Sequence, residues 1–156
     1  MTTHHLAQIN VSRLLAPLDS PQLADFVANL EPINALADHS PGFVWRLKST
    51  GGNATDIQIF DDPMIIVNMS VWTDIDALKN FAFTSAHAPV MKRRREWFET
   101  FPTAYMALWW IDAGHIPTLA EARHRLEHLD QHGPTAVAFT FKRLFDQPAA
   151  GSADHP

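Results

Sequence analysis

The segment Met64–Trp72, with the sequence MIIVNMSVW, constrains the fold more than any other part of the chain. Side chains of an extended strand point alternately to the two sides of a sheet. One side of this segment is then wholly apolar, whereas the other carries Asn68, Ser70 and Trp72 beside two aliphatic residues. We therefore predict a strand that is buried on one face and presents polar groups and an indole on the other.

The remaining apolar patterns predict an alternation of strands and helices around this strand. Further strands are expected at residues 6–11, 43–47, 57–60, 105–112 and 137–141, and helices at residues 73–83, 85–101 and from 118 to the Gly133-Pro134 pair. Another helix opens at Ser20, and Pro32 should kink or interrupt it. Thr73 with Asp76, and Thr118 with Glu121, resemble capping boxes. This order is typical of an α+β, ferredoxin-like antiparallel sheet with helices packed on one face.

Two of these strands favour a dimer. Residues 105–112 are apolar on both faces, and residues 64–72 are apolar on one entire face. A sheet that has helices on only one side needs a cover for its second apolar face. We expect a second copy of the chain to supply that cover, which predicts a homodimer with its two sheets face to face.

Composition narrows the class of protein. The 156 residues suffice for one domain, which we place at residues 5–145, with residues 146–156 as a disordered tail. The formal net charge of −5 argues against a nucleic-acid partner, and the absence of cysteine excludes disulfides and thiolate metal sites. No apolar run reaches the ~20 residues that span a bilayer, and residues 1–10 lack a signal-peptide pattern. We expect a cytoplasmic protein without membrane contact.

The expected helix at residues 85–101 carries two groups that stand out on its apolar face. His87 and Arg94 fall within a stripe formed by Val90, Met91, Trp97, Phe98 and Phe101. The helix start disfavours a charged imidazole, so His87 could act as a base, and Arg94 could bind an oxyanion. Alternatively, His87 caps the helix, and Arg94 pairs with Glu31 or Asp38.

Histidines elsewhere have weaker claims to a chemical role. His115, in the loop AGHIPT, is interpreted as a residue that fixes the loop. His124, His128 and His132 follow the four-residue spacing that can bind a metal, but they lie largely off the apolar stripe of their helix. We interpret them as a solvated face and predict no metal site.

Several motifs carry a resemblance to a known family. The run Val71-Trp72-Thr73-Asp74, followed by Leu78, Phe81 and Ser85-Ala86-His87, resembles the dimeric α/β-barrel superfamily, which includes antibiotic-biosynthesis-type and haem-degrading monooxygenases. The chain is also similar to an uncharacterised bacterial family of that superfamily over roughly residues 5–145. The matching segments are residues 6–10, 34–37, 41–47, 87–91, 94–98, 108–110, 113–118, 133–134 and 138–141.

The resemblance implies a cleft between the sheet and its helices. Cofactor-free quinone-forming members use an Asn to polarise a substrate oxygen and a Trp to line the pocket, which here correspond to Asn68 and Trp72. Alternatively, Trp72 is a core residue and Asn68 bonds to the backbone. With His87 and Arg94 closing the cleft from their helix, the predicted catalytic residues are His87, Asn68 and Arg94. The predicted substrate-binding residues, which strand parity and helix stripes place around this cleft, are Trp72, Asn10, Asn34, Met91, Trp97 and Trp110. Both Asn10 and Asn34 also fit a structural role.

Three functions remain open at this point. The first is a cofactor-independent monooxygenase, or a related isomerase or cyclase, acting on an aromatic or polyketide-like molecule, with His87 as base. The second is a haem-binding or haem-degrading protein with His87 as axial ligand and Trp72 against the porphyrin. The third is a non-catalytic dimeric module that binds an apolar or aromatic small molecule.

Overall fold

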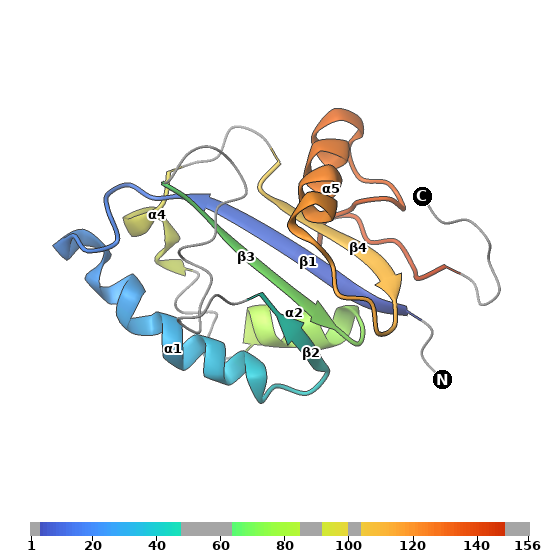
Figure 1. Ribbon diagram of the computed structural model, residues 1–156, viewed down its shortest axis with the longest axis horizontal. Coiled ribbons are helices and arrows are strands. Elements are labelled where there is room, and N and C mark those ends of the chain that lie inside the picture. Colours follow the sequence, from blue (N-terminus) through green and yellow to red (C-terminus); the bar gives the residue numbers. More distant parts are fainter. Residues whose placement is uncertain (1–3, 48–63, 85–91, 100–103, 149–156) are drawn as a thin grey trace.

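The sheet has four antiparallel strands in the order β2-β3-β1-β4 (Figure 1). The strands are β1 (His4–Arg13), β2 (Phe43–Arg46), β3 (Ile65–Trp72) and β4 (Met106–Asp112). The structure, a computed structural model, describes residues 4–47, 64–84, 92–99 and 104–148. The strand order is that of a ferredoxin-like fold, so the predicted α+β class is confirmed.

Two helices occupy one face of this sheet. α1 (Ala24–Asp38) follows a short 3-10 turn, η1 (Pro21–Leu23), and α2 (Ile75–Thr84) follows β3. Ala37 of α1 and Leu78 of α2 share an apolar cluster with Leu6, Trp72 and Leu108 of the sheet. We call this side of the sheet the α1/α2 face.

The helix expected from residue 118 is present, but it packs on the face opposite α1 and α2, whereas we expected all helices on one face. α5 (Leu119–His132) buries Ala122, Leu126 and Leu129 against the apolar side of the sheet. Ile9 of β1 and Trp109 of β4 are fully buried there within a single chain. The chain therefore covers part of its second apolar face by itself, and the homodimer stays a prediction.

The two predicted capping boxes have different outcomes. Thr118 caps α5, because its hydroxyl accepts a hydrogen bond from the Glu121 backbone N–H over 3.1 Å. At α2 the prediction of Thr73 is wrong by one residue, since Asp74 Oδ1 accepts from the Ala77 backbone N–H over 2.8 Å. The backbone N–H of Thr73 donates instead to Gly42 O over 2.8 Å and ties the helix start to the beginning of β2.

The helix expected to run to residue 101 ends earlier. α4 covers only Arg94–Trp97, and Phe98 is extended with φ −129° and ψ 145°. Phe98 forms a bridge with Leu14, and the backbone N–H of Glu99 donates to Arg13 O over 2.9 Å. Pairing with the end of β1 thus replaces the last helical turns. Residues 85–91 and 100–103 lie outside the described residues.

Two further expectations need correction. The strand expected at residues 137–141 is reduced to isolated bridges: Phe139 pairs with Leu108 through backbone hydrogen bonds of 2.8 and 2.9 Å, and Thr140 pairs with Arg143. Pro32 lies inside α1, which continues past it, so the expected interruption does not occur and the alternative, a kink, stays a prediction. Within the described ranges, no helix is both long and apolar enough to cross a bilayer.

Candidate functional site

A strip of polar side chains crosses the α1/α2 face. It consists of Gln8, Asn10 and Ser12 of β1 and Asn68 and Ser70 of β3, which we call the polar strip. Gln8 pairs in register with Ser70, and Asn10 with Asn68. The strip lies between two apolar clusters on this face, one around Trp72 and the other around Trp97. The alternation seen in the sequence of β3 therefore places Asn68, Ser70 and Trp72 on one face, as predicted, and this is the α1/α2 face.

Gln8 connects the two strands of the strip. Its Nε2 donates to Asn68 Oδ1 and to Ser70 Oγ, each over 2.7 Å. Gln8 and Ser70 are both only 7% exposed, whereas Asn68 is exposed. Buried amide groups that make two short hydrogen bonds hold their neighbours in one orientation.

These bonds decide which atoms of Asn68 and Ser70 remain to meet a ligand. Because Asn68 Oδ1 accepts from Gln8, the Nδ2 amide group of Asn68 is turned away from Gln8. Ser70 Oγ accepts from Gln8 and from Trp72 Nε1, the latter over 2.8 Å. With both lone pairs engaged, the Ser70 hydroxyl hydrogen is left to donate. The strip thus leaves two donors, the Asn68 amide and the Ser70 hydroxyl, whose orientation is set by these bonds.

Trp72 follows Ser70 on the same face of β3, and its ring is not accessible to a ligand. Its side chain is 1% exposed and packs between Phe81, stacked at 5.2 Å between ring centroids, and Phe43, edge-on at 5.5 Å. Its N–H is directed to Ser70. In this arrangement Trp72 positions Ser70 and has no uncovered ring face for a porphyrin, so the described residues do not fit the predicted haem contact.

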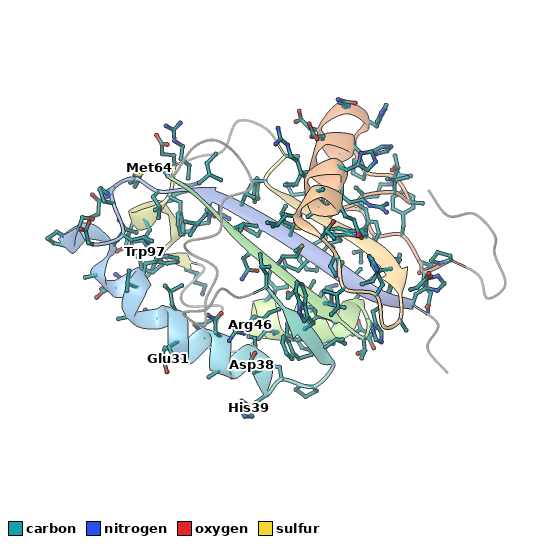
Figure 2. The ribbon with its side chains drawn as sticks, viewed as in Figure 1. Glu31, Asp38, His39, Arg46, Met64 and Trp97 are labelled. Carbon is teal, nitrogen blue, oxygen red and sulfur yellow. The ribbon has the colours of Figure 1, made fainter. Side chains whose placement is uncertain are left out.

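Arg46 brings a positive charge to the β2 side of the strip and was missed in the sequence. A register irregularity after Phe43 turns Arg46 to the same face as Ser70, its partner on β3. Its Nε and Nη2 atoms donate to Asp38 of α1 over 2.8 and 3.3 Å, and its side chain is 13% exposed. Figure 2 shows this pair between α1 and β2. The bulge could not be read from a two-residue period, although an arginine inside the apolar run FVWRL was an available signal.

Arg94 and Trp97 lie on α4, next to the far end of β1. The guanidinium of Arg94 lies 5.1 Å from the ring centroid of Tyr105. Trp97 is 1% exposed and packs with Leu14 and Leu23 in the second apolar cluster. The described contacts do not join Arg94 to Asn68.

The carboxylates considered as partners of Arg94 lie elsewhere. Asp38 binds Arg46, and Glu31 is exposed on the outer side of α1 (Figure 2). The structure therefore shows Arg94 against an aromatic ring and leaves its predicted role in binding an oxyanion a prediction.

The other predicted site residues are distributed over the same face. Asn10 is half-buried and accepts from Ser12 Oγ over 3.3 Å, and Asn34 is half-buried on α1. Trp110 shares the α1/α2 face, whereas Trp109 points to α5 and donates to Glu121. His87 and Met91 lie outside the described residues.

Trp110 also lines a hollow that is separate from the strip. Its N–H donates to Phe145 O over 2.8 Å. The hollow has a volume of about 380 Å³ and is lined by Trp110, Ile75, Leu144, Gln147 and the three carboxylates Asp74, Asp76 and Asp146. Its acidic lining does not match an anionic ligand, which separates it chemically from the polar strip.

Gln8 and Ser70 were not among the predicted site residues, although their parity was visible. Both lie at even positions on strands whose neighbouring even positions, Asn10 and Asn68, were selected. What the sequence did not contain was the register that sets Gln8 opposite Ser70, because register depends on strand pairing.

Comparisons with known proteins place this geometry in context. SnoaB, a cofactor-independent oxygenase from Streptomyces nogalater, is 18% identical over 72% of this chain and 95% of its own, with a TM-score of 0.44. PA3566 from Pseudomonas aeruginosa is 12% identical over 74% of this chain and 99% of its own, with a TM-score of 0.48. NE2512, a protein of unknown function from Nitrosomonas europaea, is 16% identical over 76% and 99%, with a TM-score of 0.44.

At the level of sequence, one family model matches. It is described as Domain of unknown function (DUF3291) and covers residues 5–155. No protein with a curated function matches the chain significantly.

Proposed function

The chain belongs to the family described as Domain of unknown function (DUF3291), and from this premise we propose a function based on the polar strip. We propose that the protein binds an aromatic or polyketide-like molecule on the α1/α2 face and oxygenates it without a cofactor. Asn68 and Ser70 hold the oxygen atom of the substrate that becomes negatively charged. The resemblance to an uncharacterised family is confirmed, and the activity is our proposal.

One observation carries the proposal. Gln8 Nε2 bonds both Asn68 Oδ1 and Ser70 Oγ over 2.7 Å, in a place where Gln8 is 7% exposed. This leaves the amide of Asn68 and the hydroxyl of Ser70 as donors that are oriented before a substrate arrives. Donors of this kind stabilise a developing oxyanion, because they need no reorganisation during the reaction.

The chemistry that such donors support is the ionisation of a phenol or an enolisable ketone. None of the five residues of the polar strip is titratable, so the base has to come from another element, and His87 remains our prediction for it. The resulting electron-rich anion transfers electrons to O₂. One oxygen atom replaces the two hydrogens of a substrate methylene as a carbonyl oxygen, and the other leaves as water.

A non-catalytic ligand-binding module is the second candidate. The polar strip has no titratable group, and this favours the non-catalytic module. Hydrogen-bond donors alone suffice to bind a polar aromatic molecule. Haem binding has no comparable support, because Trp72 is covered by Phe43 and Phe81.

Oxygen consumption with a hydroxyanthrone as probe tests the proposal. The wild-type protein should consume one O₂ per anthraquinone formed, above the rate in buffer. Asn68→Ala should lower this rate by tenfold or more, whereas Asn29→Ala should not change it, because Asn29 bonds only locally within α1, to Asp25 O. Binding of the probe without consumption of O₂ would favour the non-catalytic module, and no binding at all would overturn both candidates.

A further inference from the structure

Three histidines form a ladder along α5, on the face of the sheet opposite the polar strip. His124, His128 and His132 follow each other at intervals of four residues, and so lie on one side of the helix. The ring centroids are 6.3 Å apart for His124 and His128, and 4.5 Å apart for His128 and His132. His124 and His132 are exposed, whereas His128 is half-buried.

His128 has a feature that its neighbours lack. Its Nδ1 atom is buried and has no hydrogen-bond partner, which is uncommon for a buried ring nitrogen. Burial lowers the pKa of His128, and the nearby His132, His124 and Arg125 lower it further. A lowered pKa favours the neutral imidazole, which is the form that ligates metals.

The ring spacing distinguishes the two pairs. When two imidazoles bind one ion with metal–nitrogen distances of ~2.0–2.1 Å, the spacing of their ring centroids depends on the N–metal–N angle. It is about 4.5 Å at a right angle and about 5 Å at the tetrahedral angle. The spacing of 4.5 Å between His128 and His132 falls in this range. The spacing of 6.3 Å between His124 and His128 is reached only when the two nitrogens lie almost opposite each other.

From this geometry we propose that His128 and His132 bind one transition-metal ion, of the Zn²⁺, Ni²⁺ or Cu²⁺ class. Imidazole suits all three ions. In the described part of the chain, no group of three His, Cys, Asp or Glu side chains is placed to hold a metal. Among the described residues, the ion therefore has two protein ligands, and water completes its coordination. His124 is too far from His132 to join, because eight residues span ~12 Å of helix.

Calorimetric titration of the full-length, untagged protein with NiCl₂, and separately with ZnCl₂, tests this site. The wild type should bind one ion with an affinity that falls at least tenfold in His132→Gln and also in His128→Gln. His124→Gln is the matched control, since it removes a histidine from the same helix face, and it should bind as the wild type does. Far-ultraviolet circular dichroism checks that each variant keeps its fold.

Two results would overturn the proposal. If His124→Gln and His132→Gln lose affinity equally, the ion is bound by the ladder as a whole without the selectivity that the ring spacing requires. If none of the three variants changes the affinity, the metal binds elsewhere among the nine histidines of the chain.

Discussion

Gln8 and Ser70 face each other across β1 and β3, and the side-chain amide of Gln8 donates to the Ser70 hydroxyl over 2.7 Å. The indole N–H of Trp72 donates to the same hydroxyl oxygen over 2.8 Å. All three side chains are almost completely buried. One serine oxygen therefore satisfies two buried donors and connects the apolar cluster around Trp72 with the polar strip.

Replacing Ser70 should destabilise the protein, because two buried donors depend on its hydroxyl oxygen. Ser70→Ala leaves the N–H of Trp72 buried without an acceptor, which should lower the free energy of unfolding by about 1–3 kcal/mol. Urea denaturation measures the loss. Ser12→Ala removes a hydroxyl from the same strip at a less buried position and should cost less than about 0.5 kcal/mol. Equal effects of the two substitutions would contradict the arrangement.

Gly42 should tolerate no side chain. It has φ +81°, and a Cβ atom built on it would lie 2.5 Å from Ala77 Cβ and 2.7 Å from Thr73 Oγ1. Gly42→Ala should therefore lower the free energy of unfolding by about 2–5 kcal/mol, through backbone strain and overpacking together.

Gly114 provides the control for that substitution, because it has φ +94° but no atom within 4 Å of an added Cβ. Gly114→Ala should cost only the backbone strain of about 1–2 kcal/mol. A Gly42→Ala variant as stable as Gly114→Ala would show that the start of α2 does not contact Gly42 as described.

Glu121 should give the protein an acid-dependent component of stability. Burial raises the pKa of Glu121, but hydrogen bonds from His115 Nε2 (2.8 Å) and Trp109 Nε1 (2.9 Å) outweigh it and hold this pKa below its ordinary value of 4.5. A carboxyl whose pKa is lowered by folding stabilises the protein above its unfolded pKa, and this stabilisation is lost as the pH falls through the folded pKa.

Unfolding at several pH values measures this effect. Glu121→Gln should be less stable than the wild type at pH 7, and the difference should shrink below about pH 4.5. Glu127→Gln, which changes an exposed carboxylate on the same helix, should show a much smaller difference at every pH. If the difference in stability between Glu121→Gln and the wild type does not vary with pH, the ionisation of Glu121 is not linked to folding as proposed.

The homodimer expected from the apolar strands is tested by light scattering. α5 covers the sheet over β1 and β4, while Trp45, Leu47 and Ile65 at the β2 side of the same face are only partly buried. We predict that a second copy covers this part, so the mass in solution should be twice the 17.5 kDa of the chain. A mass of 17.5 kDa at all protein concentrations would mean that α5 suffices.

Local patterns predicted most of the fold. Alternation located β3 and the side of the sheet on which Asn68, Ser70 and Trp72 lie, and the Thr118 capping box located the start of α5. These features depend on near neighbours in the chain. Two other features depend on residues distant in the chain. The early end of α4 depends on the pairing of Phe98 with Leu14, and the position of α5 depends on its packing against β1 and β4.

The candidate site was predicted less completely for the same reason. Asn68 and Asn10 were selected by parity, but the role of Gln8 depends on its register with Ser70, and the position of Arg46 depends on an irregularity in β2. Trp72 was expected to line a pocket. Its burial under Phe43 and Phe81, which come from two other elements, shows it as a support for Ser70 instead.

The central claim is that Gln8 orients Asn68 and Ser70 as donors to a negatively charged oxygen. Gln8→Glu tests it most directly, because a carboxylate can only accept hydrogen bonds and would turn the Asn68 amide and the Ser70 hydroxyl toward itself. Gln8→Leu removes the donor without adding an acceptor. The phenolate absorption band of a hydroxyanthraquinone, titrated against each variant, reports binding, and urea denaturation verifies that each variant is folded.

We predict that the wild type binds the phenolate form, that Gln8→Leu binds it more weakly, and that Gln8→Glu binds it at least tenfold more weakly than the wild type, a loss of about 1.4 kcal/mol. Equal affinities of folded Gln8→Glu and wild-type protein for the phenolate would contradict the account.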